Sequence, residues 1–253
     1  MIKSKKLSKF KGIKHAFFNR LGRKSTGTFK GLNFGPGSSD NKKDTQKNLE
    51  IVSNKINAKS NKIVLLNQVH SNKFYYISKN SKLNSNKFKG DALITDKRKL
   101  PIAILTADCA PVLIYDEDKK MIAAIHAGWK GAYKNIVKIV VKFMITKGCS
   151  PQNITVAIGP CISGNNYEVK EDLKKKFIKK DKKNIIFFKE TKNKYYFNLS
   201  KYIHFELKSL KIKKIDIINK DTFNAKNNFF SARRSISHNE NDYGRNISII
   251  MIN

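Results

Sequence analysis

Cysteine and long apolar runs are scarce in this chain of 253 residues. Its three cysteines, Cys109, Cys149 and Cys161, are an odd number set far apart, which argues against a disulfide framework and favours reduced thiols in a cytosol. Residues 1–20 are basic and lack the continuous apolar segment of a signal peptide, and no later run approaches membrane-spanning length. We therefore expect a cytoplasmic protein that makes no membrane contact.

Linker-like sequence is also absent. The chain has 13 glycines and 5 prolines, but no segment rich in Pro, Ser or Gly divides it, and no repeat appears at solenoid periods. A chain of this length can bury a sizeable core. We expect one domain over residues 1–253.

Acidic residues are few, 19 against 52 Lys and Arg, which gives a net charge of +33. Such a charge is typical of proteins that bind nucleic acid or an anionic surface. Here, however, lysine is accompanied throughout by asparagine and isoleucine, whose codons are also rich in A and T, so genomic bias accounts for the charge. No helix-turn-helix, zinc-finger or RNA-recognition signature is present. We expect no specific nucleic-acid partner.

Short apolar runs separated by turns predict strands buried on both faces. The helical spacing of apolar residues over 136–144, followed by Gly148, predicts a helix, and further helices are expected over 169–180 and after a cap at Asn198 or Ser200. Turns at "DKRK" and "DEDKK" are expected to form hairpins. The fold class is therefore α+β, a sandwich with a mixed sheet flanked by helices. The strand segments are "KIVLLNQV", "DALITD", "LPIAILTADCAPVLIYD", "MIAAIHAG" and "ITVAIGP".

Three potential metal ligands follow or end these apolar runs: His70, Cys109 and His126. Their wide separation excludes a zinc-finger knuckle but suits a site assembled from several strand ends. Two imidazoles and a thiolate leave the fourth position of a tetrahedral zinc open for water or substrate, and zinc lowers the pKa of bound water to near 7. Asp108 and Gln68, polar groups beside the ligands, could orient them.

Each ligand also has a plain structural interpretation. A lone histidine near an apolar run is often a hydrogen-bonded core residue, and a cysteine between alanines is often a small buried hydrophobe. Trp129, in the glycine turn after His126, is either a core residue or a wall that stacks on a flat base. Spacing alone leaves these alternatives open.

Seven motifs, in this order and spacing, resemble a known family: "NQVHS", "GDALITD", "LTADCAPVLIYD", "AAIHAGWKGAYKNIV", "AIGPCISGNNYEV", "FFSARR" and "YGRNISII". The family is the laccase-domain or multicopper polyphenol oxidase family, whose members are now described as purine nucleoside phosphorylases, with one bacterial branch described as a peptidoglycan editing factor. The resemblance implies an α/β sandwich and a zinc site formed by His70, Cys109 and His126.

The resemblance also implies that purine nucleosides and phosphate are the small-molecule substrates. An open zinc position could also deliver hydroxide to C6 of adenine, which would make deamination of adenosine a second activity of the same site. Arginine suits phosphate because its planar fork pairs with two oxygens. A multicopper cluster would need more imidazoles than the five histidines provide, and a single copper is less favoured than zinc in a reducing cytosol. The candidate catalytic residues are Cys109, His126 and Asp108, and the candidate substrate-binding residues are Arg20, Asn33, Gln68, Asp91, Arg233 and Arg245.

Two other functions stay open. Without a metal, Cys109 as the thiolate nucleophile and His126 as the base would make a cysteine-type amidase, which fits the peptidoglycan-editing branch. A non-enzymatic basic protein would bind nucleic acid with an affinity that collapses in salt and survives the loss of Cys109.

Overall fold

The structure is a computed structural model that describes residues 1–22, 25–35, 37–58, 63–81 and 89–253. The strands are β1 (Ile13–Phe17), β2 (Phe74–Ile77), β3 (Ala92–Thr95), β4 (Ile102–Thr106), β5 (Ala110–Asp116), β6 (Met121–Ala127), β7 (Ile154–Ile158), β8 (Glu168–Val169), β9 (Phe188–Thr191), β10 (Lys194–Phe197), β11 (Lys214–Ile217) and β12 (Asn246–Ile252). The helices are α1 (Lys42–Lys55), α2 (Trp129–Tyr133), α3 (Ile136–Thr146), α4 (Glu171–Lys180), α5 (Leu199–Ser209) and α6 (Ala232–Ser237), with 3₁₀ turns η1 (Leu7–Lys9), η2 (Gly27–Phe29), η4 (Lys182–Phe187) and η5 (Ala225–Asn227).

Among the described residues the strands form three sheets. A six-stranded sheet has the order β11-β7-β5-β6-β3-β2, and two three-stranded sheets have the orders β1-β12-β4 and β8-β10-β9. The large sheet is mixed, because β11 pairs with β7 and β2 with β3 in parallel while its other pairs are antiparallel. The expected α+β class with a mixed sheet is confirmed. The domain limits of 1–253 stay a prediction.

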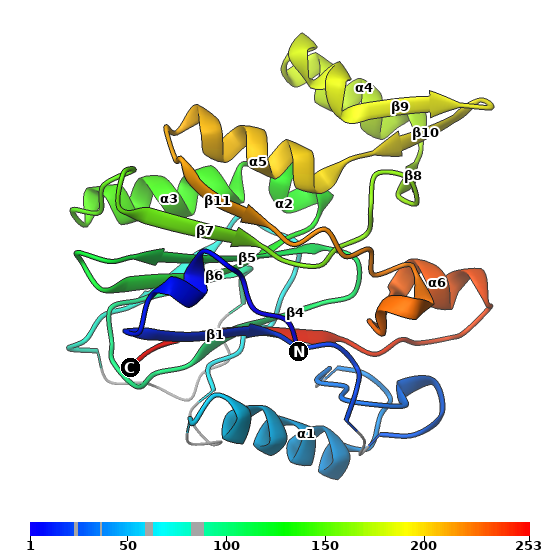
Figure 1. Cartoon of the computed structure of the whole chain (residues 1–253). Coiled ribbons are helices and arrows are strands. Elements are labelled where there is room, and N and C mark those ends of the chain that lie inside the picture. Colours follow the sequence, from blue (N-terminus) through cyan, green and yellow to red (C-terminus); the bar gives the residue numbers. More distant parts are fainter. Residues whose placement is uncertain (23–24, 36, 59–62, 82–88) are drawn as a thin grey trace.

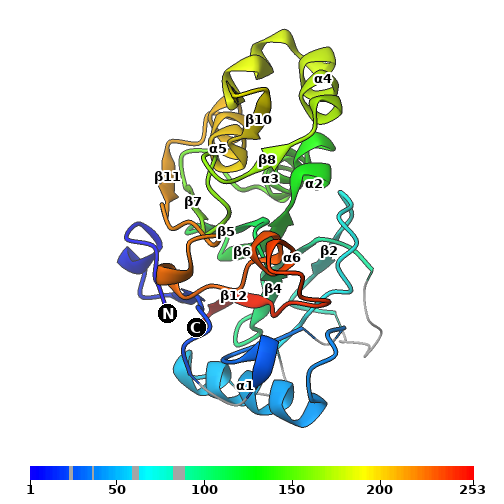
Figure 2. The ribbon, with the colours of Figure 1, turned by 90° about the vertical axis from the view of Figure 1, so that its right-hand side faces the viewer.

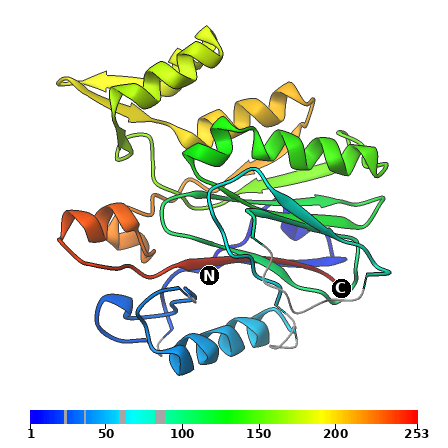
Figure 3. The same cartoon turned by 180° about the vertical axis from the view of Figure 1, so that it is seen from behind.

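The two larger layers of the molecule are the β1-β12-β4 sheet and the six-stranded sheet, stacked face to face (Figure 1). Helix α1 covers the outer face of the β1-β12-β4 sheet, hereafter the small sheet. Helices α3 and α5 cover the outer face of the six-stranded sheet, as the view from behind also shows (Figure 3). The side view places the β8-β10-β9 sheet and α4 at the end of the stack farthest from α1 (Figure 2).

Apolar packing on both faces explains why the central strands have continuous apolar runs. On β6, Ala123 and Ile125 face the helices, whereas Ile122 and Ala124 face the small sheet, and all four are fully buried. Because side chains alternate along a strand, a strand enclosed on both sides needs an apolar residue at every position. The polar residues of these strands therefore collect at the strand ends, where the candidate site lies.

Three helix predictions are confirmed. Helix α3 covers Ile136–Thr146 and is followed by Gly148 at φ +89°, the left-handed conformation that glycine adopts without strain. Helix α4 falls within 169–180. Helix α5 begins after Asn198, whose side-chain oxygen accepts a hydrogen bond from the backbone N–H of Lys201.

One hairpin prediction and two strand predictions are wrong. The apolar run over 100–116 is not one strand, because it is divided into β4 and β5, which belong to different sheets. The turn at 96–99 does not close a hairpin, since β3 belongs to the six-stranded sheet and β4 to the small one, and the chain crosses between layers there. Residues 63–69 form only isolated bridges, at Val64 and Asn67, and Lys62 lies outside the described residues. By contrast, the hairpin at "DEDKK" is confirmed as the β5–β6 connection.

No helix within the described ranges has the length and apolar character needed to cross a membrane.

The cap of α5 gives a stability prediction. Replacing Asn198 with Ala should lower the free energy of unfolding by about 1 kcal/mol, because a helix N–H then loses its acceptor. Ser200→Ala is the comparison variant, since the Ser200 hydroxyl donates to Asn198 but accepts no helix N–H, and it should cost less than half as much. Urea unfolding measures both, and equal losses would show that Asn198 does not act as the cap.

Candidate functional site

His70, Cys109 and His126 converge in the structure. Their potential ligand atoms all lie within 4.8 Å of one another. Cys109 Sγ is 3.7 Å from His70 Nε2, and the two imidazole rings meet edge to face with centroids 4.7 Å apart. His126 is buried, Cys109 half-buried and His70 exposed, so the group opens to solvent on one side. We call these three residues the His-Cys-His group.

Strand pairing brings the group together. Pro111, the second residue of β5, is paired with His126 near the end of β6, which places Cys109 beside that end. Ile125 of β6 is paired with Ala92, the first residue of β3, so Asp91 lies at the same edge. The backbone N–H of His126 donates to the Asp91 carbonyl over 2.8 Å.

Asp91 connects two of the ligands. Its fully buried carboxylate accepts hydrogen bonds from the backbone N–H groups of Val69 (3.2 Å), His70 (2.9 Å) and Ser71 (2.6 Å), and from the Ser71 hydroxyl (2.7 Å). It also lies 2.8 Å from His126 Nδ1. Because an ionised carboxylate only accepts, Nδ1 carries a proton, so the ring would present the lone pair of Nε2 to a metal once Nε2 has lost its own proton.

The backbone is strained at two residues of the site. His70 has φ +57° and Asp108 has φ +86°, a region that residues with a Cβ seldom occupy. Hydrogen bonds to Asp91 hold the first, and contacts of the Asp108 side chain hold the second.

Gly128 is required by close approach. A Cβ at this position would lie 2.8 Å from Cys109 Sγ and 3.0 Å from His70 Cδ2. Its own φ is −80°, so any residue could adopt the backbone conformation, and it is the space that excludes a side chain. A glycine therefore follows the strand that carries His126 because a side chain would not fit there.

The charges of the group favour a thiolate. Burial alone would raise the pKa of the Cys109 thiol, but the His126 charge and hydrogen bonds with His126 and His70 lower it to about 6. Burial would lower the pKa of His126, but the Cys109 thiolate and Asp91 raise it to about 9. Burial would raise the pKa of Asp91, yet hydrogen bonds from His126 and Ser71 lower it to about 2. The thiolate is the form that binds metals.

Asp108, predicted to be catalytic, holds α6 in place. Its carboxylate accepts from the Thr222 hydroxyl (2.6 Å), the Ser231 hydroxyl (2.9 Å) and the backbone N–H of Arg233 (2.7 Å). Burial raises the pKa of this carboxyl. These contacts favour a positioning role, and proton transfer by Asp108 stays a prediction.

Two other predicted substrate-binding residues have their polar groups bonded to the protein. Gln68 donates from Nε2 to the Leu105 carbonyl and accepts from the Leu105 N–H, each over 2.7 Å. Its side-chain amide thus makes with Leu105 of β4 the two hydrogen bonds that the backbone of a neighbouring strand would make. The buried Asn33 accepts from the N–H groups of Gly35 and Arg245 and donates to Ser38 and Asp40.

The arginines differ in what their guanidinium groups bind. Arg234 donates to three backbone carbonyls, of Thr222, Phe223 and Phe229. Arg245 pairs with Asp242 over 2.9 Å and lies on the Tyr243 ring. Arg20 is half-buried, with its backbone N–H bonded to Asn228.

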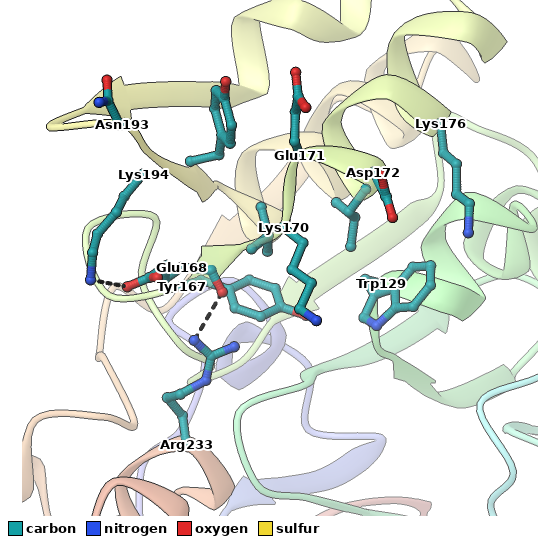
Figure 4. Close-up of a pocket in the computed structure, with 13 residues that line it drawn as sticks. Trp129, Tyr167, Glu168, Lys170, Glu171, Asp172, Lys176, Asn193, Lys194 and Arg233 are labelled. Atoms are coloured by element: carbon teal, nitrogen blue, oxygen red, sulfur yellow. Dashed lines mark hydrogen bonds and ion pairs between the residues drawn. The ribbon is translucent and has the colours of Figure 1, made fainter.

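Arg233 differs from the other arginines because its side chain lines a pocket of about 730 Å³. Its guanidinium donates one hydrogen bond, to the Glu168 carbonyl over 2.9 Å. The pocket lies between α2, α6, β8, β10 and the start of α4 (Figure 4). Trp129 and Tyr167 also line it. Two lining residues are linked to the segments that carry the His-Cys-His group: Trp129 follows Gly128, which lies against Cys109 and His70, and the Arg233 N–H is bonded to Asp108.

Sequence reasoning did not single out Tyr167. The residue lies in the "GNNYEV" stretch of a recognised motif, which was the available signal. Its position in a pocket depends on how β8 and β10 pack, and the sequence does not reveal that packing.

Comparison with known proteins identifies the family. Residues 14–253 match the family described as multi-copper polyphenol oxidoreductase laccase. The chain belongs to this family. A purine nucleoside phosphorylase of Rickettsia conorii is 36% identical over 204 residues, which cover 78% of this chain and 82% of that protein. A purine nucleoside phosphorylase of Bacteroides thetaiotaomicron is 30% identical over 245 residues, 92% of this chain and 91% of the other.

A solved structure has the same fold as this laccase-family chain. The hypothetical protein YfiH of Bacillus licheniformis superposes with a TM-score of 0.88 at 25% identity, covering 95% of this chain and 93% of the other. The recognised family and the sandwich fold are thereby confirmed.

The histidines of this family member do not form a multicopper cluster. Within the described residues the His-Cys-His group is the one place where three or more His, Cys, Asp or Glu side chains could hold a metal ion. His15 is buried and accepts the Ser4 N–H, and burial lowers its pKa to about 4. His204 lies on α5 and His238 follows α6.

The role of Asp91 can be tested by metal affinity. Asp91→Asn should weaken metal binding by about 10- to 100-fold, because the substitution removes the charge that orients His126 and the turn at His70. Asp116→Asn is the matched control, since this buried carboxylate also accepts backbone N–H groups, from Lys119 and Ser150, but at the opposite end of β5. Competition with a chromogenic chelator measures both affinities, and equal affinities would show that Asp91 does not support the ligands.

The lowered pKa of Cys109 predicts its reactivity in metal-free protein. Thiolate forms above the pKa, so alkylation by iodoacetamide should rise with pH and reach half its maximal rate near pH 6. Cys149 and Cys161, whose pKa values burial raises to about 12, should stay unlabelled. Peptide mass spectrometry identifies the site, and a midpoint near the ordinary thiol pKa would contradict the charge arrangement.

Proposed function

We propose that this protein is a zinc-dependent purine nucleoside phosphorylase that also deaminates adenosine. The observation that carries the proposal is the convergence of His70, Cys109 and His126, together with a pocket lined by aromatic and charged side chains, among them Arg233. The names of the curated relatives support the same reaction class. We further propose a cytoplasmic enzyme whose partners are a nucleoside and phosphate.

The donor set fits zinc. Tetrahedral zinc with bonds of about 2.3 Å to sulfur and about 2.0–2.1 Å to nitrogen separates those two ligands by about 3.5 Å, close to the 3.7 Å between Cys109 Sγ and His70 Nε2. Two imidazoles and one thiolate leave a position open, as catalytic zinc sites do. His70, Cys109 and His126 would hold the ion, which when bound supplies a Lewis acid.

The remaining roles fall to side chains around the group. Arg233 binds phosphate, because its guanidinium lines the pocket and most of its donors are not used by the protein. In phosphorolysis an oxygen of hydrogen phosphate forms the bond to the sugar C1′ while the bond from C1′ to the base nitrogen breaks, and the base leaves with the proton that the phosphate gives up. Asp108 positions Arg233 by binding its backbone N–H. Arg20 and Arg245 are secondary candidates for substrate contact.

Deamination needs no phosphate, because water supplies the new oxygen at C6 of adenine and ammonia leaves. The two reactions would therefore share the His-Cys-His group but not the phosphate contact. This difference allows the residues of one reaction to be separated from those of the other.

A metal and activity test follows. Wild-type protein purified under reducing conditions should contain about one zinc per chain. Cys109→Ala should abolish both adenosine phosphorolysis and adenosine deamination, since both depend on the same ligands. Arg233→Ala should reduce phosphorolysis about tenfold or more and deamination less. Chromatography of adenosine products with and without phosphate, together with elemental analysis, measures these outcomes.

Arg98→Ala is the control, since Arg98 is exposed in the turn after β3, at the end of the sheet away from the site. It should leave both rates unchanged. Near wild-type turnover of Cys109→Ala would refute the site. Full activity in metal-free wild-type protein would favour the cysteine-nucleophile alternative.

A further inference from the structure

We propose that Glu206 of α5 is a proton-operated switch behind the wall of the pocket. While its carboxyl is neutral, α5 packs closely against α2 and α3, and loss of the proton loosens this packing and the contacts that hold α4. Glu206 belongs neither to the His-Cys-His group nor to the pocket lining. The inference does not depend on the proposed function, because its test measures the order of α4 and α5 and not a reaction.

Glu206 is buried without the partners that a carboxylate needs. Its side chain is 1% exposed, and neither carboxylate oxygen has a hydrogen-bond partner. The carboxylate of Asp91 is also buried, but it has five donors. A buried charge that lacks such donors is costly. The position of Glu206 therefore accommodates the neutral carboxyl better than the ion.

The nearest cation is Lys138 of α3, and it is not a close partner. Its Nζ lies 4.0 Å from Glu206 Oε1, and its side chain is 32% exposed, so it remains largely hydrated. The two lysines that begin η4 are exposed. The charged and titratable groups that act on Glu206 or on the Tyr202 hydroxyl next to it are Lys138 of α3, Lys180 of α4, Tyr202 of α5 itself, Tyr133 of α2 and Asp181 between α4 and η4.

The second cation, Lys180, is already bonded elsewhere. Its ammonium donates to the Tyr133 carbonyl, the Asn135 side chain and the Tyr202 hydroxyl. Burial accordingly outweighs both lysines and raises the pKa of Glu206 to about 7. A carboxylate formed above this pH can be solvated only if α5 moves enough to admit water or to bring a lysine closer.

Tyr202 connects such a movement to α4. It lies one turn before Glu206 on α5, and its ring meets Phe177 of α4 edge to face at 5.1 Å and Phe187 of η4 at 5.3 Å. Its hydroxyl accepts a hydrogen bond from Lys180 at the end of α4. The first turns of α4 line the pocket. A shift of α5 would therefore change the position of the pocket wall.

Proton linkage gives the direction of the effect. The pKa of Glu206 is higher in the folded protein than the ordinary value of 4.5, so the folded state holds the proton more tightly. The stability that this contributes is fully present below pH 4.5 and is lost as the pH rises to about 7. His204, on the same helix, would act in the opposite direction, because burial, Lys208 and Lys6 lower its pKa and stability would then fall with falling pH.

Hydrogen–deuterium exchange, corrected for the intrinsic effect of pH, measures the order of α4 and α5. In the wild type their amide protection should fall about tenfold or more from pH 5 to pH 8, and by more than that of β5 and β6, which serve as the internal reference. Glu206→Gln keeps the shape of the side chain without the charge and should abolish the fall. Equal wild-type protection at the two pH values, or the same fall in Glu206→Gln, would overturn the proposal.

Lys138→Met gives a second readout. Without this positive charge the carboxyl ionises less readily, so the pH at which the fall is complete should move upward. Lys142→Met is the matched control, since Lys142 is an exposed lysine one turn later on α3, and it should leave the profile unchanged. His204→Gln should also keep the fall. An unmoved profile in Lys138→Met, or a fall abolished in His204→Gln, would show that Glu206 is not the titrating group.

Thermal unfolding checks that each variant is folded. If Glu206→Gln does not fold, the wild-type profile and its displacement in Lys138→Met decide the question. A protein that shows the switch but no phosphorolysis would refute the proposed function and leave this inference standing. Phosphorolysis in a protein whose α4 protection does not change with pH would refute the switch alone.

Discussion

The buried carboxylate of Asp91 is the constraint on which the rest of the site depends. A charge removed from water is costly unless it is paired and hydrogen-bonded, and this one has five donors: His126 Nδ1, the Ser71 hydroxyl and three consecutive backbone N–H groups. Those donors belong to one ligand and to the turn that carries another. The hydrogen bonds that satisfy the Asp91 charge therefore also position the ligands. One of them, from the His70 N–H, holds His70 in its left-handed conformation.

The sheet supplies the rigidity that such a small group needs. Strands β3, β5 and β6 are adjacent and fully buried along their lengths, so their shared edge cannot shift without disturbing packing on both faces. Cys109 and His126 extend from this edge, and Gly128 lets the chain turn away without filling the space. The strained φ of Asp108, just before Cys109, is held by the contacts of its own carboxylate with α6 and Thr222. A loop alone would not fix ligand atoms this closely.

Features that depend on neighbouring residues alone could be predicted from the sequence. Helical spacing predicts α3 and α4, the cap at Asn198 predicts the start of α5, and the continuous apolar runs predict strands buried on both faces. It identified the three residues that converge, but their meeting depends on strand order, which periodicity does not specify. Gln68 shows the limit: its amide looks like a substrate contact until the partner, the Leu105 backbone, is seen. The turn at 96–99 was likewise predicted to close a hairpin, because turn residues do not determine which sheet the next strand joins.

The His-Cys-His group and the lining of the pocket come from different parts of the molecule. Cys109 and His126 lie at strand ends of the large sheet and His70 lies in the segment before β2, whereas the pocket is lined from α2, α4, α6, β8 and β10. Lys180, at the end of α4, joins the two by donating to Asn135 over 2.6 Å, at the junction of α2 and α3. Because α2 begins directly after Gly128, this hydrogen bond connects α4 to the segment that carries Trp129. His70 and His126 are held instead by their hydrogen bonds with Asp91 at the edge of the large sheet.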